Sequence, residues 1–366
     1  MRIAHVFKDA SPPLVAGITC YISDVSAAMV QRGHDVEIHV AGVRISRQDR
    51  LPSGAVVRRH REYARLLSMP LAPGLVAEVV GSRADVIHVH LPNPIGEIGA
   101  VLNRSSAVVC TFHAQLGRQR WLEAPYGLLR RRLFDRAHRI LVASEAMASG
   151  PELVRHGSKT LVLPYGVSPR LSFGTPHRDV EREPDLLRLL FVGRLVYYKG
   201  VEVVLHAIGR VPGAILTVIG DGVDRARLEE IASKLGISER TRFVGTVSDG
   251  ELARAFSEAD VFVLPSVSRA EAFGLAMAEA MAAGVPAIST SLGTGTDWVN
   301  IDGETGLVVT PGSVGALADA IVRLRDSQLR ETMGRSAMER AQAVFSFERH
   351  VAVLEDVYRS AAICRP

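Results

Sequence analysis

The chain has 366 residues, of which 47% are hydrophobic and 22% are charged, and its net charge is +4. This length is too great for one ordinary hydrophobic core, so we expect two domains. The composition excludes a disordered chain, and the absence of an apolar run of about 18 residues argues against a membrane-spanning helix.

Short β-branched runs alternate with helical patterns in the first half of the chain, which is typical of an α/β domain with a parallel sheet. A helix is expected at 19–32. The expected strands are 2–7, 35–40, 85–91, 107–112, 139–143 and 160–163. Residues 169–185 are polar, carry prolines and show no apolar period, so we interpret them as a linker after a first domain at 1–168.

The second half repeats the alternation and predicts a second domain at 186–345. Its expected strands are 188–193, 214–219, 241–245, 260–264, 285–289 and 306–309. Its expected helices are 199–210, 223–236, 248–258, 274–283 and 313–325, followed by a broken helix at about 328–362. The predicted fold is therefore α/β, with two Rossmann-like doubly wound domains facing across a cleft, and the helix at about 346–366 can pack back on the first domain.

The positive charge is concentrated in the first half, where residues 1–170 hold 22 Lys and Arg against 13 Asp and Glu. No nucleic-acid motif is present, so an anionic membrane surface or lipid-linked acceptor is the favoured partner. A helical pattern at 118–140 could present such a surface, and the alternative is a core-packed helix with a solvated basic face. Its basic residues are Arg130, Arg131, Arg132, Arg136 and Arg139.

Compartment and metal chemistry are indicated by the cysteines and histidines. Cys20, Cys110 and Cys364 are scattered without metal-ligand spacing, and "MRIAHVF" begins without a signal-peptide pattern. We therefore expect a cytoplasmic protein, which could be peripheral at the inner face of the membrane. His5, His88 and His90 fall in strand patterns and are interpreted as packing residues or part of a cleft wall. They are not spaced as a metal site with Asp or Glu support, so no metal is expected.

Three loops that follow predicted strands in the second half carry candidate chemistry. Arg194 and Lys199 offer a guanidinium fork and a compact ammonium, which suit two bridged phosphates. Gly274 permits close approach of backbone to a ligand and opens a helix, with Glu271 before it and Glu279 two turns inside. This helix end can bind an anion, and the carboxylates of Glu271 and Glu279 on either side of it can accept hydrogen bonds from hydroxyls of a ligand. Such an arrangement suits a nucleotide-diphosphate sugar. Taken singly, the Arg–Lys loop reads as ordinary surface, Glu279 as an exposed helix residue, and "GDG" at 220–222 as a common turn.

The second half resembles the retaining glycosyltransferases of family 4, which have the GT-B architecture. The resemblance rests on "FVGRLVYYKG", "VIGDG", "ADVFVLPS", "EAFGLAMAEAMAAGVPAIST" and "GETGLVV", while "DVIHVHLPNP", "TFHAQ" and "LPYGV" match more loosely in the first half. It implies transfer of a hexosyl group, mannosyl-type with GDP-mannose favoured, to a glycan or lipid-linked acceptor of the bacterial surface. It also implies metal-independent catalysis without a cofactor.

The resemblance also implies roles for individual residues. Arg194 and Lys199 would bind the diphosphate beside Gly193, Glu271 would hold the transferred sugar, and Glu279 would bind the ribose. Backbone amides near Phe273, Gly274 and Leu275 would assist, and from the first domain Gly17 would approach the diphosphate and His113 would reach the sugar. Two departures from the family pattern are Ala16 before Gly17 and the absence of a glutamate from 292–300.

Other functions remain open. A phosphorylase or a sugar-nucleotide epimerase can share the GT-B fold, and a non-catalytic scaffold could partner another transferase. The scaffold is disfavoured because Glu271, Arg194 and Lys199 are all present, and a dehydrogenase is disfavoured because no dinucleotide fingerprint appears. Acceptor specificity is expected to lie in the loops 44–75 and 92–126.

Overall fold

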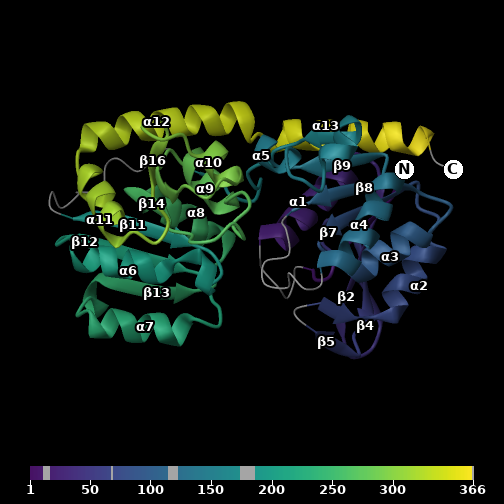
Figure 1. Cartoon of the computed structure of the whole chain (residues 1–366), viewed down its shortest axis with the longest axis horizontal. Helices are drawn as coiled ribbons and strands as arrows, with labels where there is room; N and C mark the ends of the chain where they lie inside the picture. Colours follow the sequence, from purple (N-terminus) through teal and green to yellow (C-terminus); the bar gives the residue numbers. More distant parts are fainter. Residues whose placement is uncertain (11–16, 67–68, 114–122, 174–185, 365–366) are drawn as a thin grey trace. The chain divides into compact units, whose positions relative to one another are not determined.

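The structure is a computed structural model that describes residues 1–10, 17–66, 69–113, 123–173 and 186–364 (Figure 1). The chain divides into two compact units: unit 1 is Met1–Pro164 with Glu348–Pro366, and unit 2 is Tyr165–Phe347. The divisions follow Pro164 and Phe347, whereas the sequence suggested 168 and 345. Residues 169–173 of the expected linker therefore belong to unit 2, where the Arg170 guanidinium lies 3.0 Å from the Asp249 carboxylate.

Unit 1 is built on an eight-stranded sheet in the order β10-β9-β8-β7-β1-β2-β4-β3. All neighbouring strands are parallel except β3, which runs antiparallel to β4 at the edge and departs from the purely parallel sheet expected. A separate hairpin is formed by β5 and β6. The strands are β1 (Arg2–Val6), β2 (Asp35–Val43), β3 (Arg47–Arg50), β4 (Val56–Arg61), β5 (Ala64–Leu66), β6 (Met69–Leu71), β7 (Val86–Leu91), β8 (Ala107–Phe112), β9 (Arg139–Val142) and β10 (Thr160–Val162).

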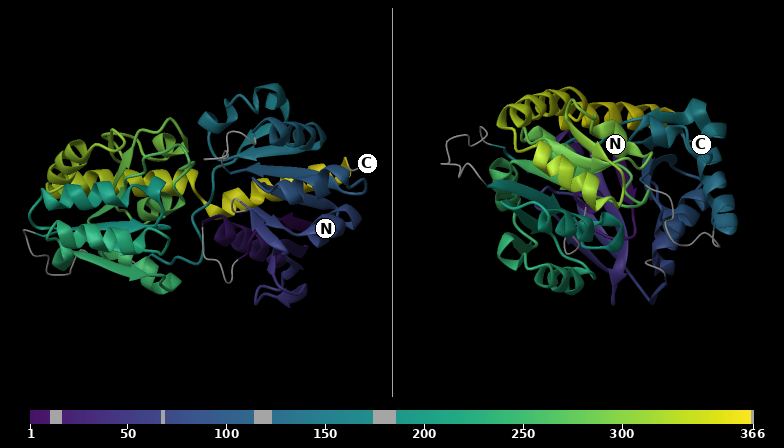
Figure 2. Two further views of the ribbon diagram at one scale, coloured as in Figure 1. Left: turned by 60° about the horizontal axis from the view of Figure 1, so that its bottom comes forward. Right: turned by 60° about the vertical axis from the view of Figure 1, so that its left-hand side comes forward.

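Helices lie on both faces of the unit 1 sheet (Figure 2), which is why every position of β7 and β8 is buried. They are α1 (Gly17–Gln31), α2 (Pro73–Gly81), α3 (Pro94–Leu102), α4 (Glu123–Arg136), α5 (Glu145–Ala148), the 3-10 helix η2 (Val154–Lys159) and α13 (Phe347–Ile363). The last of these, drawn in yellow, runs along unit 1 (Figure 1), as the sequence allowed.

Polar contacts hold α13 in place on unit 1. The Tyr358 hydroxyl lies 2.6 Å from His88 Nδ1, and the Tyr21 hydroxyl lies 2.9 Å from His350 Nε2. Glu355 accepts from Arg32 at 2.6 Å, and this guanidinium is the first cause that lowers the pKa of Glu355 to about 2. Distant parts of the chain are thereby joined through buried hydrogen bonds as well as through packing.

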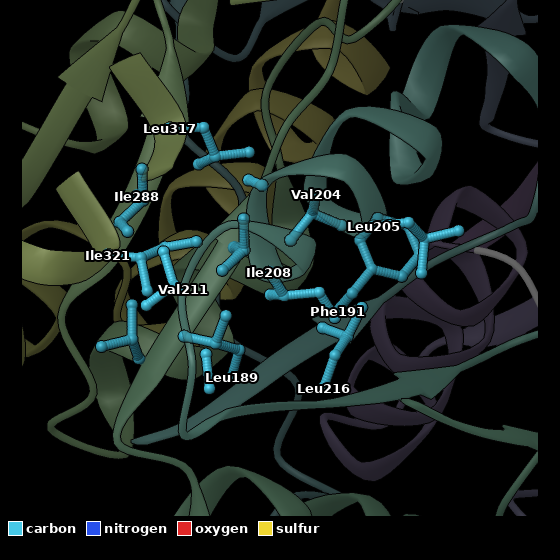
Figure 3. Packing of buried hydrophobic residues seen from close by; sticks show 14 of the residues in the cluster. Leu189, Phe191, Val204, Leu205, Ile208, Val211, Leu216, Ile288, Leu317 and Ile321 are labelled. Carbon is cyan, nitrogen blue, oxygen red and sulfur yellow. The ribbon is translucent and has the colours of Figure 1, made fainter. Parts of the chain in front are cut away.

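Unit 2 is built on a six-stranded parallel sheet in the order β13-β12-β11-β14-β15-β16. Its apolar core packs α6 and α11 on β11 and β12, with Phe191, Val204 and Ile321 fully buried (Figure 3). The strands are β11 (Leu187–Val192), β12 (Ala214–Ile219), β13 (Thr241–Gly245), β14 (Val261–Leu264), β15 (Ala287–Thr290) and β16 (Gly306–Val309). The helices are η3 (Tyr197–Lys199), α6 (Val201–Gly209), α7 (Arg225–Lys234), η4 (Ser238–Arg240), α8 (Asp249–Glu258), α9 (Leu275–Ala282), α10 (Gly295–Val299), α11 (Val314–Arg323) and α12 (Ser327–Val344).

Each parallel sheet has a point at which the strand order changes direction. In unit 2 the chain fills β12 and β13 on one side of β11, and then β14, β15 and β16 on the other. In unit 1 the corresponding point lies between β1 and β7. Ligands of open α/β sheets bind beyond the carboxyl ends of the strands at such switch points, so these two edges are where a site is expected. None of the described helices combines the length and the hydropathy that crossing a membrane requires.

Candidate active site

The loops after β11 and β14 bring two predicted site residues together at the switch point of unit 2. Lys199, at the end of η3, places its Nζ 2.6 Å from Oε2 of Glu271. The same carboxylate oxygen accepts from the Ser266 hydroxyl at 3.1 Å. Both charged side chains are largely buried, with 15% of Lys199 and 9% of Glu271 exposed, so water screens this ion pair less than a surface pair.

Gly193 and Arg194 form the first part of the same loop. A Cβ built on Gly193 would lie 3.6 Å from Lys199 Nζ, so the glycine lies directly beside the ammonium group. Arg194 is exposed. The structure thus joins Gly193, Lys199 and Glu271, and it presents the Arg194 guanidinium to solvent at the edge of the loop.

The "GDG" turn after β12 supports this loop from the side. The amide of Gly193 donates to the Ile219 carbonyl at 3.0 Å, and the amide of Leu195 donates to the Asp221 carbonyl at 2.9 Å. Gly220 has φ +123°, and a Cβ there would collide with the Gly193 carbonyl oxygen. The turn therefore needs glycine because two backbones meet there, a role that the motif alone did not indicate.

Helix α9 begins at Leu275 with Gly274 as its N-cap, one residue after the expected start, and follows Glu271 closely. Gly274 adopts φ +85° and ψ +55°, a left-handed conformation that costs other residues energy. Phe273 is buried and packs edge-on against Tyr165 with ring centroids 5.0 Å apart. Leu275 starts the helix, and Glu279 lies in its second turn, half-buried. The aromatic contact and the positive φ fix the direction in which the first α9 amides point.

The loop at 291–297 contains functional candidates that sequence reasoning missed. The Thr294 hydroxyl donates to the Glu271 carbonyl at 2.8 Å, and the Gly295 amide donates to the Ala272 carbonyl at 2.9 Å. Asp297 accepts from the amides of Leu292 at 3.0 Å and Gly293 at 2.9 Å. In the segment 292–300, which lacks the family's glutamate, Asp297 thus holds the turn through two backbone amides. Thr294 joins this segment to the backbone at Glu271. The only sequence signal for this was a cluster of Thr, Gly and Asp after a strand.

The two predicted site residues of unit 1 lie near the other switch point. Gly17 is the first residue of α1 and is exposed. His113 follows β8 and is buried, with its Nε2 3.0 Å from Nδ1 of His90. Ala16 and residues 114–122 lie outside the described residues.

The histidines interpreted from the sequence as packing residues form one cluster with His113. His5 Nδ1 lies 3.0 Å from His90 Nε2, and His88 contacts the hydroxyls of Tyr358 and Thr111 at 2.6 and 2.7 Å. One nitrogen each of His5, His88 and His90 lies within 4.8 Å of the others. Both nitrogens of His88 already contact hydroxyls, however, and no carboxylate joins this group within the described part of the chain. The geometry describes a hydrogen-bonded histidine cluster.

A cavity of about 450 Å³ opens in unit 1 near the carboxyl ends of β1 and β2. Arg65 makes two hydrogen bonds of 2.8 Å to Glu62 and one of 3.0 Å to Asp9 on its wall. Tyr63 lies at the rim with 62% of its surface exposed. A second cavity of about 310 Å³ lies among residues at the opposite ends of these strands, including Arg2 and Asp35.

The predicted basic surface at 118–140 is smaller than its arginine count suggested. Arg130 is buried, with its guanidinium carbon 5.2 Å from the Tyr126 ring, and Arg136 donates to the Ala100 carbonyl at 2.9 Å. Arg139 is half-buried in β9, which leaves Arg131 and Arg132 exposed. Residues 118–122 lie outside the described residues.

Two family models match the chain. Residues 175–340 match "Glycosyl transferases group 1", and residues 15–171 match "Glycosyltransferase Family 4". Among characterised proteins, the chain is 31% identical to the D-rhamnosyltransferase WbpZ of Pseudomonas aeruginosa, over 94% of this chain and 92% of the relative. It is 25% identical to the O-antigen chain mannosyltransferase C of Escherichia coli, over 98% of both chains.

Solved structures share the whole fold. A sucrose-phosphate synthase of Thermosynechococcus elongatus superposes with a TM-score of 0.82 at 22% identity, covering 98% of each chain. The Anabaena protein Alr3699/HepE, in complex with UDP and glucose, superposes with a TM-score of 0.80 at 19% identity, covering 98% of this chain and 100% of that chain. The α/β architecture of two Rossmann-like units is therefore the GT-B architecture.

Proposed function

The chain belongs to glycosyltransferase family 4, and from this premise we propose that it is a retaining hexosyltransferase that uses a nucleotide-diphosphate sugar. The transferred group is mannosyl-type, and the acceptor is a hydroxyl of a glycan or lipid-linked glycan. The relatives named as a mannosyltransferase and a D-rhamnosyltransferase favour this sugar class, and GDP-mannose is the first donor to test.

The contact between Lys199 and Glu271 carries the proposal. An ammonium group has three N–H donors, so Lys199 can hold Glu271 and a phosphate oxygen at the same time. The Arg194 guanidinium supplies a second, exposed cation on the same loop. The first amides of α9 begin four residues after Glu271 and favour an anion by the helix dipole. The cations and amides match a diphosphate, and the neighbouring carboxylate matches a polyhydroxylated group attached to that diphosphate.

The chemistry follows from where charge develops. The bond between the anomeric carbon and the diphosphate oxygen breaks, while the acceptor oxygen bonds to the same face of the sugar. The acceptor's proton passes to the departing phosphate oxygen. Lys199, Arg194 and the α9 amides stabilise the negative charge that grows on the diphosphate, which is the largest electrostatic demand of the step. Glu271 orients the sugar through its hydroxyls, and Glu279 is assigned to the ribose.

We place the acceptor in the 450 Å³ cavity of unit 1. Its walls hold carboxylates and guanidiniums that already pair with one another, so they offer fixed donors and acceptors with little net charge. The exposed Tyr63 ring adds an apolar platform of the kind that a sugar ring can cover. Tyr63→Ala should therefore raise the KM for the acceptor and leave donor hydrolysis unchanged. An unchanged acceptor KM would remove the cavity from the proposal.

A transfer assay tests the function itself. The purified chain is incubated with labelled GDP-mannose and mannose- or rhamnose-terminated acceptors, with and without EDTA. Lys199→Ala and Arg194→Ala should each lower kcat about 10²- to 10³-fold, the usual cost of removing one charge-stabilising group. Lys234→Ala is the matched control, because Lys234 is an exposed lysine paired with Glu230 on α7. Near-normal turnover of both site variants would contradict the assignment, and loss of activity in EDTA would contradict metal-independent transfer.

A further inference from the structure

The mouth of the 450 Å³ cavity in unit 1 is bordered by a connection between two strands that are not neighbours. Residues 44–46 join β2 to β3, and β4 lies between these two strands in the sheet. The connection therefore passes over the carboxyl end of β4, where the Ser46 hydroxyl accepts from the Arg61 amide at 3.0 Å. Because the parallel strands β1 and β2 end at this same edge, the crossing places residues 44–46 beside the cavity.

Four exposed side chains belong to this crossing and to the segment after β4. We call them the cavity rim: Arg44, Ile45, Arg61 and Tyr63. Arg44 and Tyr63 also line the cavity, so the rim lies at its mouth. Single exposed apolar side chains are ordinary on a protein surface. Here, however, 79% of Ile45 is exposed next to Ser46, which bonds the Arg61 amide, and the Arg61 guanidinium carbon lies 4.5 Å from the centroid of the Tyr63 ring. Apolar and cationic groups are therefore adjacent on the rim.

Charge distinguishes the rim from the wall of the cavity. On the wall, Arg65 pairs with Glu62 at 2.8 Å and with Asp9 at 3.0 Å. On the rim, Arg44 and Arg61 form no ion pair with any carboxylate of the residues that the structure describes. The wall thus offers balanced donors and acceptors that suit a neutral sugar, whereas the rim carries two guanidiniums that suit an anion.

The size of the cavity limits how much of an acceptor it can hold. Its volume of about 450 Å³ lies in the lower part of the range for small-ligand sites, roughly 300–1,000 Å³. Such a volume suits the terminal sugar of a glycan, so whatever is attached to that sugar leaves over the rim. The attached group meets two guanidiniums and, beside them, the exposed Ile45 side chain. A phosphate ester of a lipid matches this set, because an anionic group is joined in it to an apolar one.

We infer that the acceptor is a glycan linked to a lipid through a phosphate or diphosphate, with Arg44 and Arg61 holding the phosphate oxygens and Ile45 contacting the first carbons of the lipid. The inference rests on the proposed function, because it concerns the acceptor of the same reaction. It selects the lipid-linked class from the two acceptor classes given above. It also commits the rim to the acceptor's own carrier and not to the surface of a bilayer.

Calorimetric titration with farnesyl diphosphate tests the rim without any transfer. The probe joins a diphosphate to a short apolar chain, and farnesol and inorganic diphosphate each supply one half of it. The wild-type chain should bind the probe at least about 10-fold more tightly than either half. Arg44→Gln and Ile45→Ser should each weaken binding of the probe about 10-fold, on the scale of one charge-assisted hydrogen bond or one buried apolar side chain. Equal affinity for the probe and for inorganic diphosphate would overturn the inference.

Val154→Ser and Arg155→Gln are the matched controls. They replace an exposed apolar side chain and an adjacent exposed arginine before β10, at the opposite edge of the sheet. Each should change the affinity for farnesyl diphosphate less than about 2-fold. Loss of binding in Lys199→Met, with no effect of the rim variants, would place the probe in unit 2 and overturn the inference. So would rim-dependent binding of phosphatidylglycerol vesicles by a chain that does not bind the probe, since the rim would then face a bilayer.

Transfer kinetics compare one sugar on two carriers. Mannose linked to farnesyl diphosphate and methyl mannoside are offered with the same donor. The KM of the wild-type chain should be at least about 10-fold lower for the lipid-linked acceptor, and Arg44→Gln or Ile45→Ser should remove most of this difference. Equal KM values in the wild-type chain would contradict the inference and leave the proposed transfer intact. Absence of transfer to either acceptor would contradict the proposed function, and the titration would still decide whether the rim binds a lipid diphosphate.

Discussion

At the scale of single residues, the site of unit 2 depends on a few backbone positions as much as on its charges. Gly274 illustrates this, because it combines a left-handed φ of +85° with close packing: a Cβ there would lie 2.9 Å from Leu264 Cδ2. The residue links Glu271 to the first turn of α9. Strained or crowded positions of this kind cluster where geometry must be held for function.

Gly274→Ala should therefore destabilise unit 2 by about 1–3 kcal/mol and weaken nucleotide binding. Gly312→Ala is the control, since Gly312 has φ +75° but a Cβ there would meet no described atom within 4 Å. The difference between the two variants in denaturant unfolding measures the crowding at α9 alone. Equal losses of stability would show that Leu264 moves aside and that the α9 start is not tightly specified.

At the scale of elements, most of the fold could be predicted because its parallel strands are buried and apolar. The strands at 214–219, 241–245 and 306–309 were predicted with their observed bounds. Strands β3 and β4 were missed because "RQDR" and "VVRRHR" carry arginines that conceal the period of a strand, although Arg59 is buried against Asp49 at 2.8 Å. The convergence of Lys199 and Glu271 followed from motif order. The anchoring by Thr294 and the cluster of His5, His88, His90 and His113 depend on tertiary contacts that no local pattern encodes.

Helix α13 is the element whose attachment gives the sharpest stability prediction. Tyr358→Phe removes the hydroxyl 2.6 Å from His88 Nδ1 and leaves a buried polar nitrogen without that partner. We expect a loss of about 1–3 kcal/mol in the free energy of unfolding, the usual cost of an unsatisfied buried group. Tyr63→Phe, at an exposed tyrosine of the same unit, should change stability by less than about 0.5 kcal/mol. A neutral Tyr358→Phe would mean that the hydrogen bond between Tyr358 and His88 contributes little to the attachment of α13.

At the scale of the whole molecule, the two units differ in their response to acid. Ten of the 12 histidines lie in unit 1. Burial lowers the pKa of His350 to about 4, and it also lowers the pKa values of the buried histidines at the switch point of this unit. These groups are neutral when folded and bind protons near pH 6.5 when unfolded. Their stabilisation is therefore complete above about pH 6.5 and is lost as the pH falls towards 3–4. One shift from 6.5 to about 4 corresponds to about 3 kcal/mol.

Acid titration should thus unfold unit 1 before unit 2. In a Trp121→Phe variant the remaining Trp298 reports on unit 2, where its ring packs 5.7 Å from Phe345. Circular dichroism of the same sample reports on both units. We expect ellipticity to fall below about pH 6 while Trp298 fluorescence stays native to lower pH. Coincident transitions would contradict this difference between the units.

Nucleotide binding by unit 2 is the claim on which the functional account depends, and a thermal-unfolding panel with GDP, UDP, ADP and dTDP tests it most directly. One nucleotide, with GDP expected first, should stabilise the wild-type chain by about 2.7 kcal/mol at a concentration of about 100 times its Kd. Lys199→Met should lose most of that stabilisation, and Lys234→Met should keep it. Failure of all four nucleotides to stabilise the protein, or equal stabilisation of the Lys199→Met variant, would contradict a diphosphate site at Lys199 and Glu271.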